Sequence, residues 1–331
     1  MNLFNTDNKK EEEVLEVMTR EEMCNAFILT LKDASISQFI NIITSRFNEV
    51  LEYADFLNGK NTCQKTSLLF NPHRLATKTI NSKQSVFEAL GNDKFLSGLA
   101  RAILYKRSPK GIKYKDMLYQ TLSMNVSGVQ YVNEFPPKKA SDLYESYNLN
   151  EDSTILDPCA GWGGRMIGAS KIKCNYIGYE PSVKTYKGLV LLSEYIGSMN
   201  KSFLCKINCL PFEESKTEIN KFDFAFTSPP YYDTEVYSYE ITNSLNKFKT
   251  FEDWCSGFYI PMIQKTMDSL KNGCTFVLNI GSRKYPLNQV LIDNFSDKYE
   301  IKIGKEKLQG KSGLKVSDKE GETFYHITKY N

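Results

Sequence analysis

From about residue 150 onward, short apolar runs rich in β-branched and aromatic residues alternate with longer segments of helical pattern. There are seven such runs: STILDPC, CNYIGYE, SFLCKIN, FDFAFTS, CTFVLNIGS, YEIKIGK and TFYHITKY. Two intervening segments, PSVKTYKGLVLLSEYIG and TFEDWCSGFYIPMIQKTMDSL, have the apolar spacing of helices. This alternation is typical of a mostly parallel sheet covered by helices on both faces. The last two runs leave no room for a crossover helix, so we expect them to pair antiparallel.

The first third of the chain has a different pattern. Apolar residues recur at three- and four-residue spacings through residues 11–57, and a second helical stretch covers residues 85–107. We therefore predict two domains, a mainly helical domain over residues 1–125 and an α/β domain over residues 126–331.

Composition excludes several classes of protein. No apolar stretch approaches the roughly 18 residues that span a bilayer, and the N-terminus has no signal-peptide pattern. We therefore expect a cytoplasmic protein with no membrane partner. The eight cysteines include no CxxC pair and the chain has only two histidines, so we expect reduced thiols and no metal site.

The first candidate site is DPCAGWGGRMIGAS, residues 157–170, which follows a predicted strand. Glycines at this position permit a tight turn and let a ligand approach the backbone. Asp157 places a carboxylate at the strand end, suited to an ammonium group, and Glu180 ends the next strand, where it could accept hydrogen bonds from two ribose hydroxyls. The alternative is a tight strand–helix turn with a surface glutamate.

The second candidate site lies in FDFAFTSPPYYDTEVYS, residues 222–238, where a buried-strand pattern stops at a serine, two prolines and two tyrosines. The alternative here is an ordinary proline-rich turn with packed tyrosines. The order of the two motifs, each at the end of a predicted strand, favours a shared site.

Both motifs resemble those of the amino-methylating DNA methyltransferases. DPCAGWGG is similar to the S-adenosylmethionine motif of that family, SPPY to its catalytic tetrapeptide, and NEFPPKKASDLYESY, residues 133–147, to the Phe-Pro segment before the cofactor strand. The resemblance implies a Rossmann-like class I methyltransferase sheet of seven strands, with S-adenosyl-L-methionine as cofactor. The chain departs from the commonest pattern at Cys159, Gly164 and Asn208.

The resemblance also assigns residues to roles. The catalytic residues it implies are Ser228, Pro229, Pro230 and Tyr231. The cofactor-binding residues it implies are Phe135, Pro136, Asp157, Cys159, Gly161, Gly163, Glu180 and Asn208.

The proposed chemistry explains why polar groups would close a core strand. The exocyclic amine of cytosine or adenine is a poor nucleophile because its lone pair is delocalised into the ring. Ser228 Oγ and the Pro229 carbonyl could accept hydrogen bonds from both N–H groups, and Tyr231 and Tyr232 offer rings to a base turned out of its stack. Serine in the first position is commoner among cytosine-N4 enzymes, which favours cytosine N4 over adenine N6.

A nucleic-acid substrate would account for the uneven charge of the chain. Residues 60–115 carry 12 Lys/Arg against two acidic residues, whereas residues 1–59 are acidic. We expect phosphate contacts from this segment, the alternative being a solvated charged face. The expected nucleic-acid-binding residues are Lys106, Arg107, Lys110, Lys113, Lys115 and Tyr232. A second basic stretch is GKEKLQGKSGLK, residues 304–315, which could also be an ordinary hairpin connection.

The expected partner is therefore DNA, with a separate specificity or restriction subunit, because the catalytic half has no long insertion for target recognition. Two alternatives stay open. One is an enzyme of the same fold that acts on RNA or on a protein glutamine side chain. The other is a non-catalytic, methyltransferase-like subunit that binds DNA.

Overall fold

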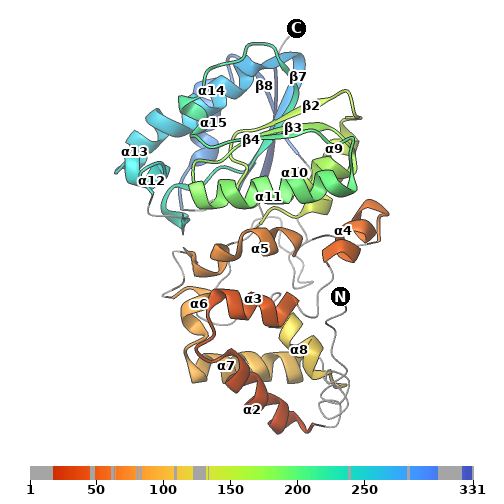
Figure 1. The fold of residues 1–331 in the computed structure, drawn as a ribbon. Helices are drawn as coiled ribbons and strands as arrows, with labels where there is room; N and C mark the ends of the chain where they lie inside the picture. The colour runs from red at the N-terminus through yellow and green to blue at the C-terminus, as the bar shows by residue number, and fades with distance from the viewer. Residues whose placement is uncertain are drawn as a thin grey trace. The chain divides into compact units, whose positions relative to one another are not determined.

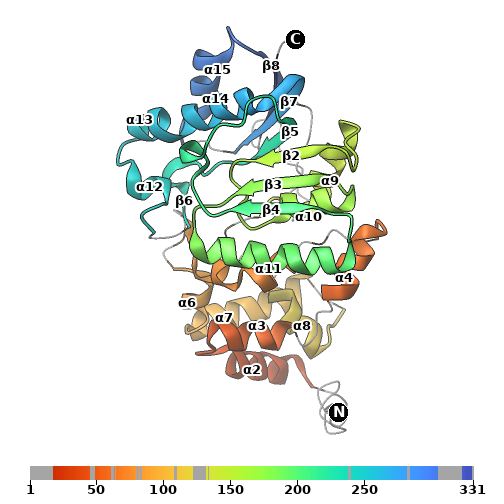
Figure 2. The ribbon, with the colours of Figure 1, turned by 45° about the horizontal axis from the view of Figure 1, so that its top comes forward.

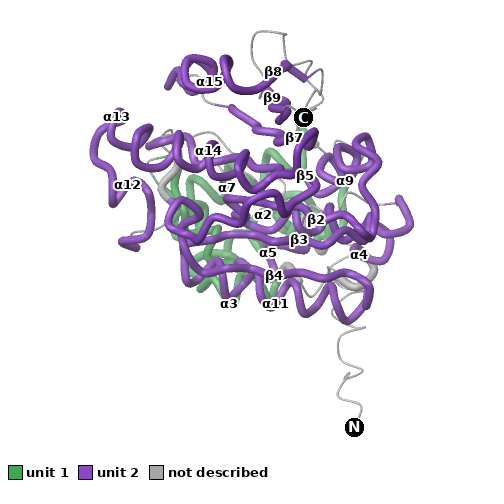
Figure 3. The backbone as a smooth tube through the Cα atoms, turned by 90° about the horizontal axis from the view of Figure 1, so that it is seen from above, with its two compact units in different colours: residues 1–51, 72–132 green, residues 52–71, 133–331 purple. Residues whose placement is uncertain are grey.

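The computed structural model describes all of the chain except residues 1–17, 45–48, 61–62, 64, 80–81, 83, 108–109, 122–131, 133, 238–239, 282–283, 305–322 and 330–331. The chain divides into two compact units, which Figure 3 distinguishes by colour: unit 1 comprises residues 1–51 and 72–132, and unit 2 comprises residues 52–71 and 133–331. Residues 52–71, which the sequence analysis assigned to the N-terminal domain, therefore pack within the unit that holds the sheet.

Unit 1 is mainly helical, as the apolar spacing predicts. Its elements are α2 (Arg20–Leu31), α3 (Ile36–Thr44), a 3-10 turn (Pro72–Ala76), β1 (Lys78–Thr79), α6 (Val86–Ala89), α7 (Asp93–Arg101), a π-helical turn (Ala102–Arg107) and α8 (Tyr114–Gln120). Helix α4 (Glu49–Leu57) crosses into unit 2. Helix α2 begins at a capping box, in which the Thr19 side chain and Glu22 satisfy each other's backbone N–H groups.

Unit 2 contains a seven-stranded sheet in the order β4-β3-β2-β5-β7-β9-β8, whose strands are labelled in Figure 3. The strands are β2 (Thr154–Asp157), β3 (Asn175–Tyr179), β4 (Cys205–Asn208), β5 (Phe222–Thr227), β7 (Leu270–Ile280), β8 (Glu300–Ile303) and β9 (Thr323–Thr328). Strands β2, β3, β4, β5 and β7 are parallel, and β9 is antiparallel to both β7 and β8. All seven predicted strands and the antiparallel pairing of the last two are confirmed, and the sheet has the Rossmann-like α/β architecture that the sequence predicts.

Helices cover both faces of this sheet (Figures 1 and 2). On one face the core takes its side chains from α9 (Pro137–Ser146), α10 (Gly164–Lys171) and α11 (Val183–Met199). On the other it takes them from α13 (Phe251–Trp254), a π-helical turn (Cys255–Tyr259), α14 (Ile260–Ser269) and α15 (Leu287–Phe295). Ile155 belongs to the first core and Leu156 to the second, because successive strand residues point to opposite faces.

The remaining elements of unit 2 are short. They are α5 (Thr66–Phe70), the 3-10 turns Phe212–Glu214 and Tyr232–Thr234, β6 (Glu235–Val236) and α12 (Ser244–Lys247). Residues 52–71 join the first core: the Tyr53 hydroxyl lies 2.8 Å from Ser170 Oγ, and the Phe70 and Tyr195 rings lie 5.3 Å apart. Across the described ranges, no helix is long and apolar enough to cross a bilayer.

The parallel order of β2, β3, β4 and β5 brings both sequence motifs to one edge of the sheet. Parallel neighbours end on the same side, so Asp157, Glu180, Asn208 and Ser228 all follow or close strands at the carboxyl edge. Ligands of doubly wound sheets bind at this edge.

Candidate active site at the carboxyl edge of the sheet

The turn between β2 and α10 has backbone angles that favour glycine. Gly161 and Gly163 have φ values of +57° and +94°. A Cβ atom at Gly163 would lie 2.8 Å from Leu192 and 2.9 Å from Leu189, and one at Gly164 would overlap the Phe135 carbonyl oxygen. The glycines therefore let the turn close tightly and let the Phe-Pro segment lie directly against it.

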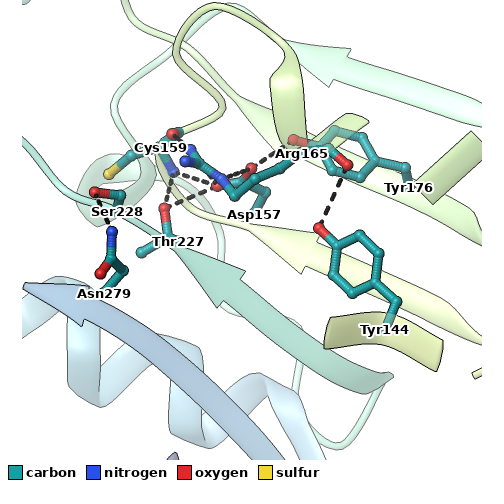
Figure 4. Close-up of polar contacts among 8 residues, drawn as sticks. All are labelled: Tyr144, Asp157, Cys159, Arg165, Tyr176, Thr227, Ser228 and Asn279. Atoms are coloured by element: carbon teal, nitrogen blue, oxygen red, sulfur yellow. Dashed lines mark hydrogen bonds and ion pairs between the residues drawn. The ribbon is translucent and has the colours of Figure 1, made fainter. Parts of the chain in front are cut away.

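Asp157 anchors this turn from inside the protein (Figure 4). Its side chain is fully buried. Its carboxylate accepts hydrogen bonds from Arg165 Nε at 2.7 Å, the Tyr176 hydroxyl at 2.5 Å, Thr227 Oγ1 at 2.8 Å and the Cys159 backbone N–H at 3.2 Å. The expected direct contact between Asp157 and a ligand ammonium group is therefore wrong for this structure, because both oxygens are engaged by the protein.

Arg165 is the cation that balances the buried carboxylate. Burial acts to lower the pKa of its guanidinium, but the neighbouring Asp157 carboxylate outweighs burial, so the pKa lies above its ordinary value. Arg165 also donates to the Cys159 carbonyl oxygen, and its guanidinium carbon lies 6.0 Å from the centre of the Phe135 ring. The pair thus ties α10, the glycine turn and the Phe-Pro segment into one unit.

Glu180 lies beside the glycine turn, as the sequence predicts. Its half-buried carboxylate accepts a hydrogen bond from the Ser182 N–H at 2.9 Å and another from the Gly161 backbone. Burial raises the pKa of this carboxyl to about 8. The Glu180 N–H donates to the Asn208 carbonyl at 3.0 Å, and the Asn208 amide donates to the Gly178 carbonyl at 3.3 Å. The structure therefore brings Gly161, Glu180 and Asn208 together.

Ser228 follows β5 and is half-buried. Its Oγ lies 2.8 Å from the Tyr231 hydroxyl and accepts a hydrogen bond from Asn279 Nδ2 at 3.4 Å (Figure 4 shows the second contact). The preceding residue, Thr227, accepts a hydrogen bond from the Cys159 N–H at 3.1 Å. The serine motif is therefore held against the glycine turn by the residue next to Ser228.

The other predicted residues of these motifs lie close by. The Phe135 ring packs edge-on against Phe226 of β5 with the ring centres 4.9 Å apart, and Pro136 caps the start of α9. Pro229 is buried and Pro230 half-buried. The Phe-Pro segment thus contacts both the glycine turn and β5, the strand that precedes Ser228.

Tyr232, which the sequence analysis expected to bind nucleic acid, packs against other aromatic side chains. Its ring makes edge contacts with Phe251, Trp254 and Tyr285 at 5.1–5.8 Å, and its hydroxyl donates to the Lys249 carbonyl at 2.8 Å. Burial raises the pKa of the hydroxyl. Three aromatic rings thus contact the edge of the partly buried Tyr232 ring, and its stacking on a base stays a prediction.

The basic segment is only partly a surface feature. Lys106, Lys110 and Lys113 are exposed, whereas Arg74 is buried and Lys78 pairs with Glu88 at 2.8 Å. The side chains of Arg107 and Lys115 and residues 305–315 of the second basic stretch lie outside the described residues. In the part of the chain that is described, no three His, Cys, Asp or Glu side chains gather to hold a metal ion.

Sequence reasoning missed four residues that hold the two motifs in place. Arg165 and Tyr176 donate to Asp157, Asn279 donates to Ser228, and Thr227, next to Ser228, bonds to both Asp157 and Cys159. Two of them carried a usable signal. Arg165 directly follows the glycine pair and is one of only two arginines after residue 126, and Thr227 directly precedes Ser228. Tyr176 and Asn279 carried none, because their contacts depend on which strands become neighbours.

Comparison with known proteins gives only distant likenesses. No family model matches the chain, and no curated protein matches it. Among solved structures, it is similar to a tRNA (m1A58) methyltransferase from Aquifex aeolicus, with 13% identity, 60% of this chain and 71% of that chain covered, and a TM-score of 0.39. It is also similar to a SAM-dependent O-methyltransferase from Thermotoga maritima, with 13% identity, coverages of 64% and 71%, and a TM-score of 0.41.

Proposed function

We propose that the protein is an S-adenosyl-L-methionine-dependent methyltransferase that modifies the exocyclic amine of a DNA base, with cytosine N4 favoured over adenine N6. One observation carries the proposal. The half-buried Ser228 hydroxyl stands at the carboxyl end of β5, and Thr227 ties that end to the glycine turn beside Glu180. An acceptor for an amine and an acceptor for a ribose are thus held at one edge of the sheet.

The residues of this edge fit the proposed cofactor. Gly161 and Gly163 keep the turn free of side chains, and the Glu180 carboxylate beside them could accept hydrogen bonds from the two ribose hydroxyls. Asn208, at the end of the next strand, is suited to the adenine side. When bound, the cofactor supplies an electrophilic methyl group. Asp157 would contribute to cofactor binding indirectly, by fixing the shape of the glycine turn, because its carboxylate oxygens already accept hydrogen bonds from Arg165 and Thr227.

The role of the serine motif is to orient the target amine. Ser228 Oγ and the Pro229 carbonyl would accept hydrogen bonds from its two N–H groups, so that the nitrogen lone pair points away from the base ring. The Tyr231 ring would support the base turned out of its stack. Positioning and electrostatics supply the rate in such a site, because the chain needs no covalent intermediate.

We further propose that the exposed lysines of unit 1, Lys106, Lys110 and Lys113, contact DNA phosphates. Binding to DNA would then weaken steeply as salt rises, since each neutralised phosphate releases counterions. We also propose that the protein lies in the cytoplasm, bound to the nucleoid through DNA. A separate specificity or restriction subunit would select the target sequence, because the catalytic unit has no long recognition insertion. Changing all three lysines to Gln should flatten the salt dependence, and an unchanged slope would reject these contacts.

The experiment for the proposed function is to incubate the protein with cofactor labelled in its methyl group and, separately, with DNA, RNA or total protein. We expect label in DNA, at an amino nitrogen identified by digestion to nucleosides, and its loss in Ser228→Ala. Label in RNA or protein alone would contradict the DNA substrate. No label in any polymer, with cofactor still bound, would favour a non-catalytic subunit.

A further inference from the structure

The hydrogen bonds around Ser228 form a chain with a defined direction. The Tyr231 hydroxyl lies 3.3 Å from the Asn279 backbone carbonyl, which can only accept, so Tyr231 donates its single proton there. The hydrogen bond of 2.8 Å between Tyr231 and Ser228 must then be donated by Ser228. The chain runs from the Ser228 hydroxyl through the Tyr231 hydroxyl to the carbonyl of Asn279.

This direction fixes what Ser228 can offer to a ligand. A serine hydroxyl has one proton to donate and two lone pairs that accept. The proton is directed to Tyr231, and one lone pair takes the hydrogen bond from Asn279 Nδ2 at 3.4 Å. The remaining position on this half-buried oxygen is an acceptor.

We infer that the Tyr231 hydroxyl is a positioning group that holds Ser228 as a hydrogen-bond acceptor, so that the site takes an N–H group and rejects a carbonyl oxygen at the same place. This inference rests on the proposed function and adds to it. The base must present an amine, as adenine and cytosine do, and the deaminated bases hypoxanthine and uracil, with a carbonyl there, are excluded by the direction of one hydrogen bond.

The role of the hydroxyl is separate from that of the ring. If Tyr231 kept its ring and lost its hydroxyl, the Ser228 O–H could rotate and donate to a ligand as readily as it accepts. A carbonyl oxygen would then be tolerated. Loss of the hydroxyl should therefore change which base binds rather than whether the protein folds.

The test compares Tyr231→Phe with wild type and with Tyr259→Phe. Tyr259 is a matched control because its hydroxyl also donates to a backbone carbonyl, that of Leu287 at 3.3 Å. The probes are short, mixed-sequence single-stranded DNAs with adenine and cytosine, and the same DNAs with hypoxanthine and uracil in their place. Fluorescence anisotropy gives the Kd for each set, and thermal unfolding checks that each variant is folded.

We expect wild type and Tyr259→Phe to bind the amino-bearing DNA about tenfold more tightly, the value of roughly one hydrogen bond to a defined acceptor, and Tyr231→Phe to bind both sets within about twofold. Full discrimination retained by Tyr231→Phe, or none in wild type, would overturn the inference. The proposed function is judged separately by label transfer: a wild type that methylates DNA while Tyr231→Phe still discriminates refutes only the inference. A wild type that discriminates but transfers no label refutes only the proposed function.

Discussion

The ends of β2 and β5 lie at the same edge of one sheet and are built in opposite ways. Asp157 at the end of β2 is fully buried, and its carboxylate accepts hydrogen bonds from four residues, which lie in α10, β3, β5 and the glycine turn. Ser228, just past β5, is half-buried and keeps one acceptor position beyond its contacts with Tyr231 and Asn279. The first end gives the turn its shape, and the second leaves a group for a ligand. Polar residues at strand ends are therefore not equivalent, even in one site.

The largest effect on stability is expected from removing the cation beside Asp157. Arg165→Met leaves a buried carboxylate without its charge partner, and we expect the free energy of unfolding to fall by about 3–5 kcal/mol. Urea unfolding measures the change. The control is Lys138→Met, which removes an exposed pair with Asp142 at 2.8 Å and should cost less than about 1 kcal/mol. Equal effects of the two substitutions would show that Asp157 is no anchor.

The opposite result is expected at Ser228. Ser228→Ala should lower the rate of methyl transfer by about a hundredfold, because one oriented partner of the reacting group is lost. Its unfolding free energy should fall by only about 1 kcal/mol, because the hydrogen bonds with Tyr231 and Asn279 are lost. The control is Ser256→Ala, which removes an exposed hydroxyl that donates a hydrogen bond to the Asp253 carbonyl. A stable variant with full activity would remove Ser228 from the catalytic residues.

Thr227 allows both strand ends to be tested together, because it bonds to Asp157 at the end of β2 and directly precedes Ser228 at the end of β5. Thr227→Val keeps the shape of the side chain but removes the hydroxyl that donates to Asp157 and accepts from the Cys159 N–H, which should cost about 1–3 kcal/mol of stability. It should also weaken binding of S-adenosylhomocysteine in calorimetry. Thr227→Ser, which keeps the hydroxyl, should recover most of both losses. Identical behaviour of the two variants would mean that the hydroxyl does not link the motifs.

The smallest effect concerns pH. Because burial raises the pKa of Glu180 to about 8, its carboxyl is mostly protonated at neutral pH and ionises as pH rises. The carboxylate is the better acceptor for two hydroxyls, so affinity for S-adenosylhomocysteine should increase by roughly tenfold from about pH 7 to about pH 9. Glu180→Gln should bind weakly with little dependence on pH. A flat profile in wild type would contradict the ribose role of Glu180.

The fold was more predictable from sequence than the site. Each of the seven strands is a local run of apolar, β-branched or aromatic residues, so its pattern does not depend on distant neighbours. The sequence also predicted that Glu180 and Ser228 lie at one edge of the sheet, because each directly follows a predicted strand. Residues 52–71 show the limit. Residues 52–57 continue the helical pattern of residues 11–51, and only packing against residues such as Ser170 and Tyr195 assigns residues 52–71 to unit 2.

The contacts of each site residue were less predictable from sequence, because they depend on how distant segments pack together. The Asp157 carboxylate looked open in sequence, yet Tyr176 and Thr227 reach it from the strands on either side. Tyr232 looked like a second stacking ring, yet its left-handed backbone, with φ of +53°, accompanies a ring packed against Trp254 and Tyr285. In both cases the sequence placed the residue near the site but did not predict the residues that it contacts.

The most direct measurement for the central claim is a crystal structure of the protein with S-adenosylhomocysteine. We predict the ribose hydroxyls within hydrogen-bond distance of the Glu180 carboxylate, and the sulfur facing Ser228 across the glycine turn. A ligand bound with its ribose away from Glu180, or with its sulfur turned from Ser228, would contradict the assignment of this sheet edge as the site of methyl transfer.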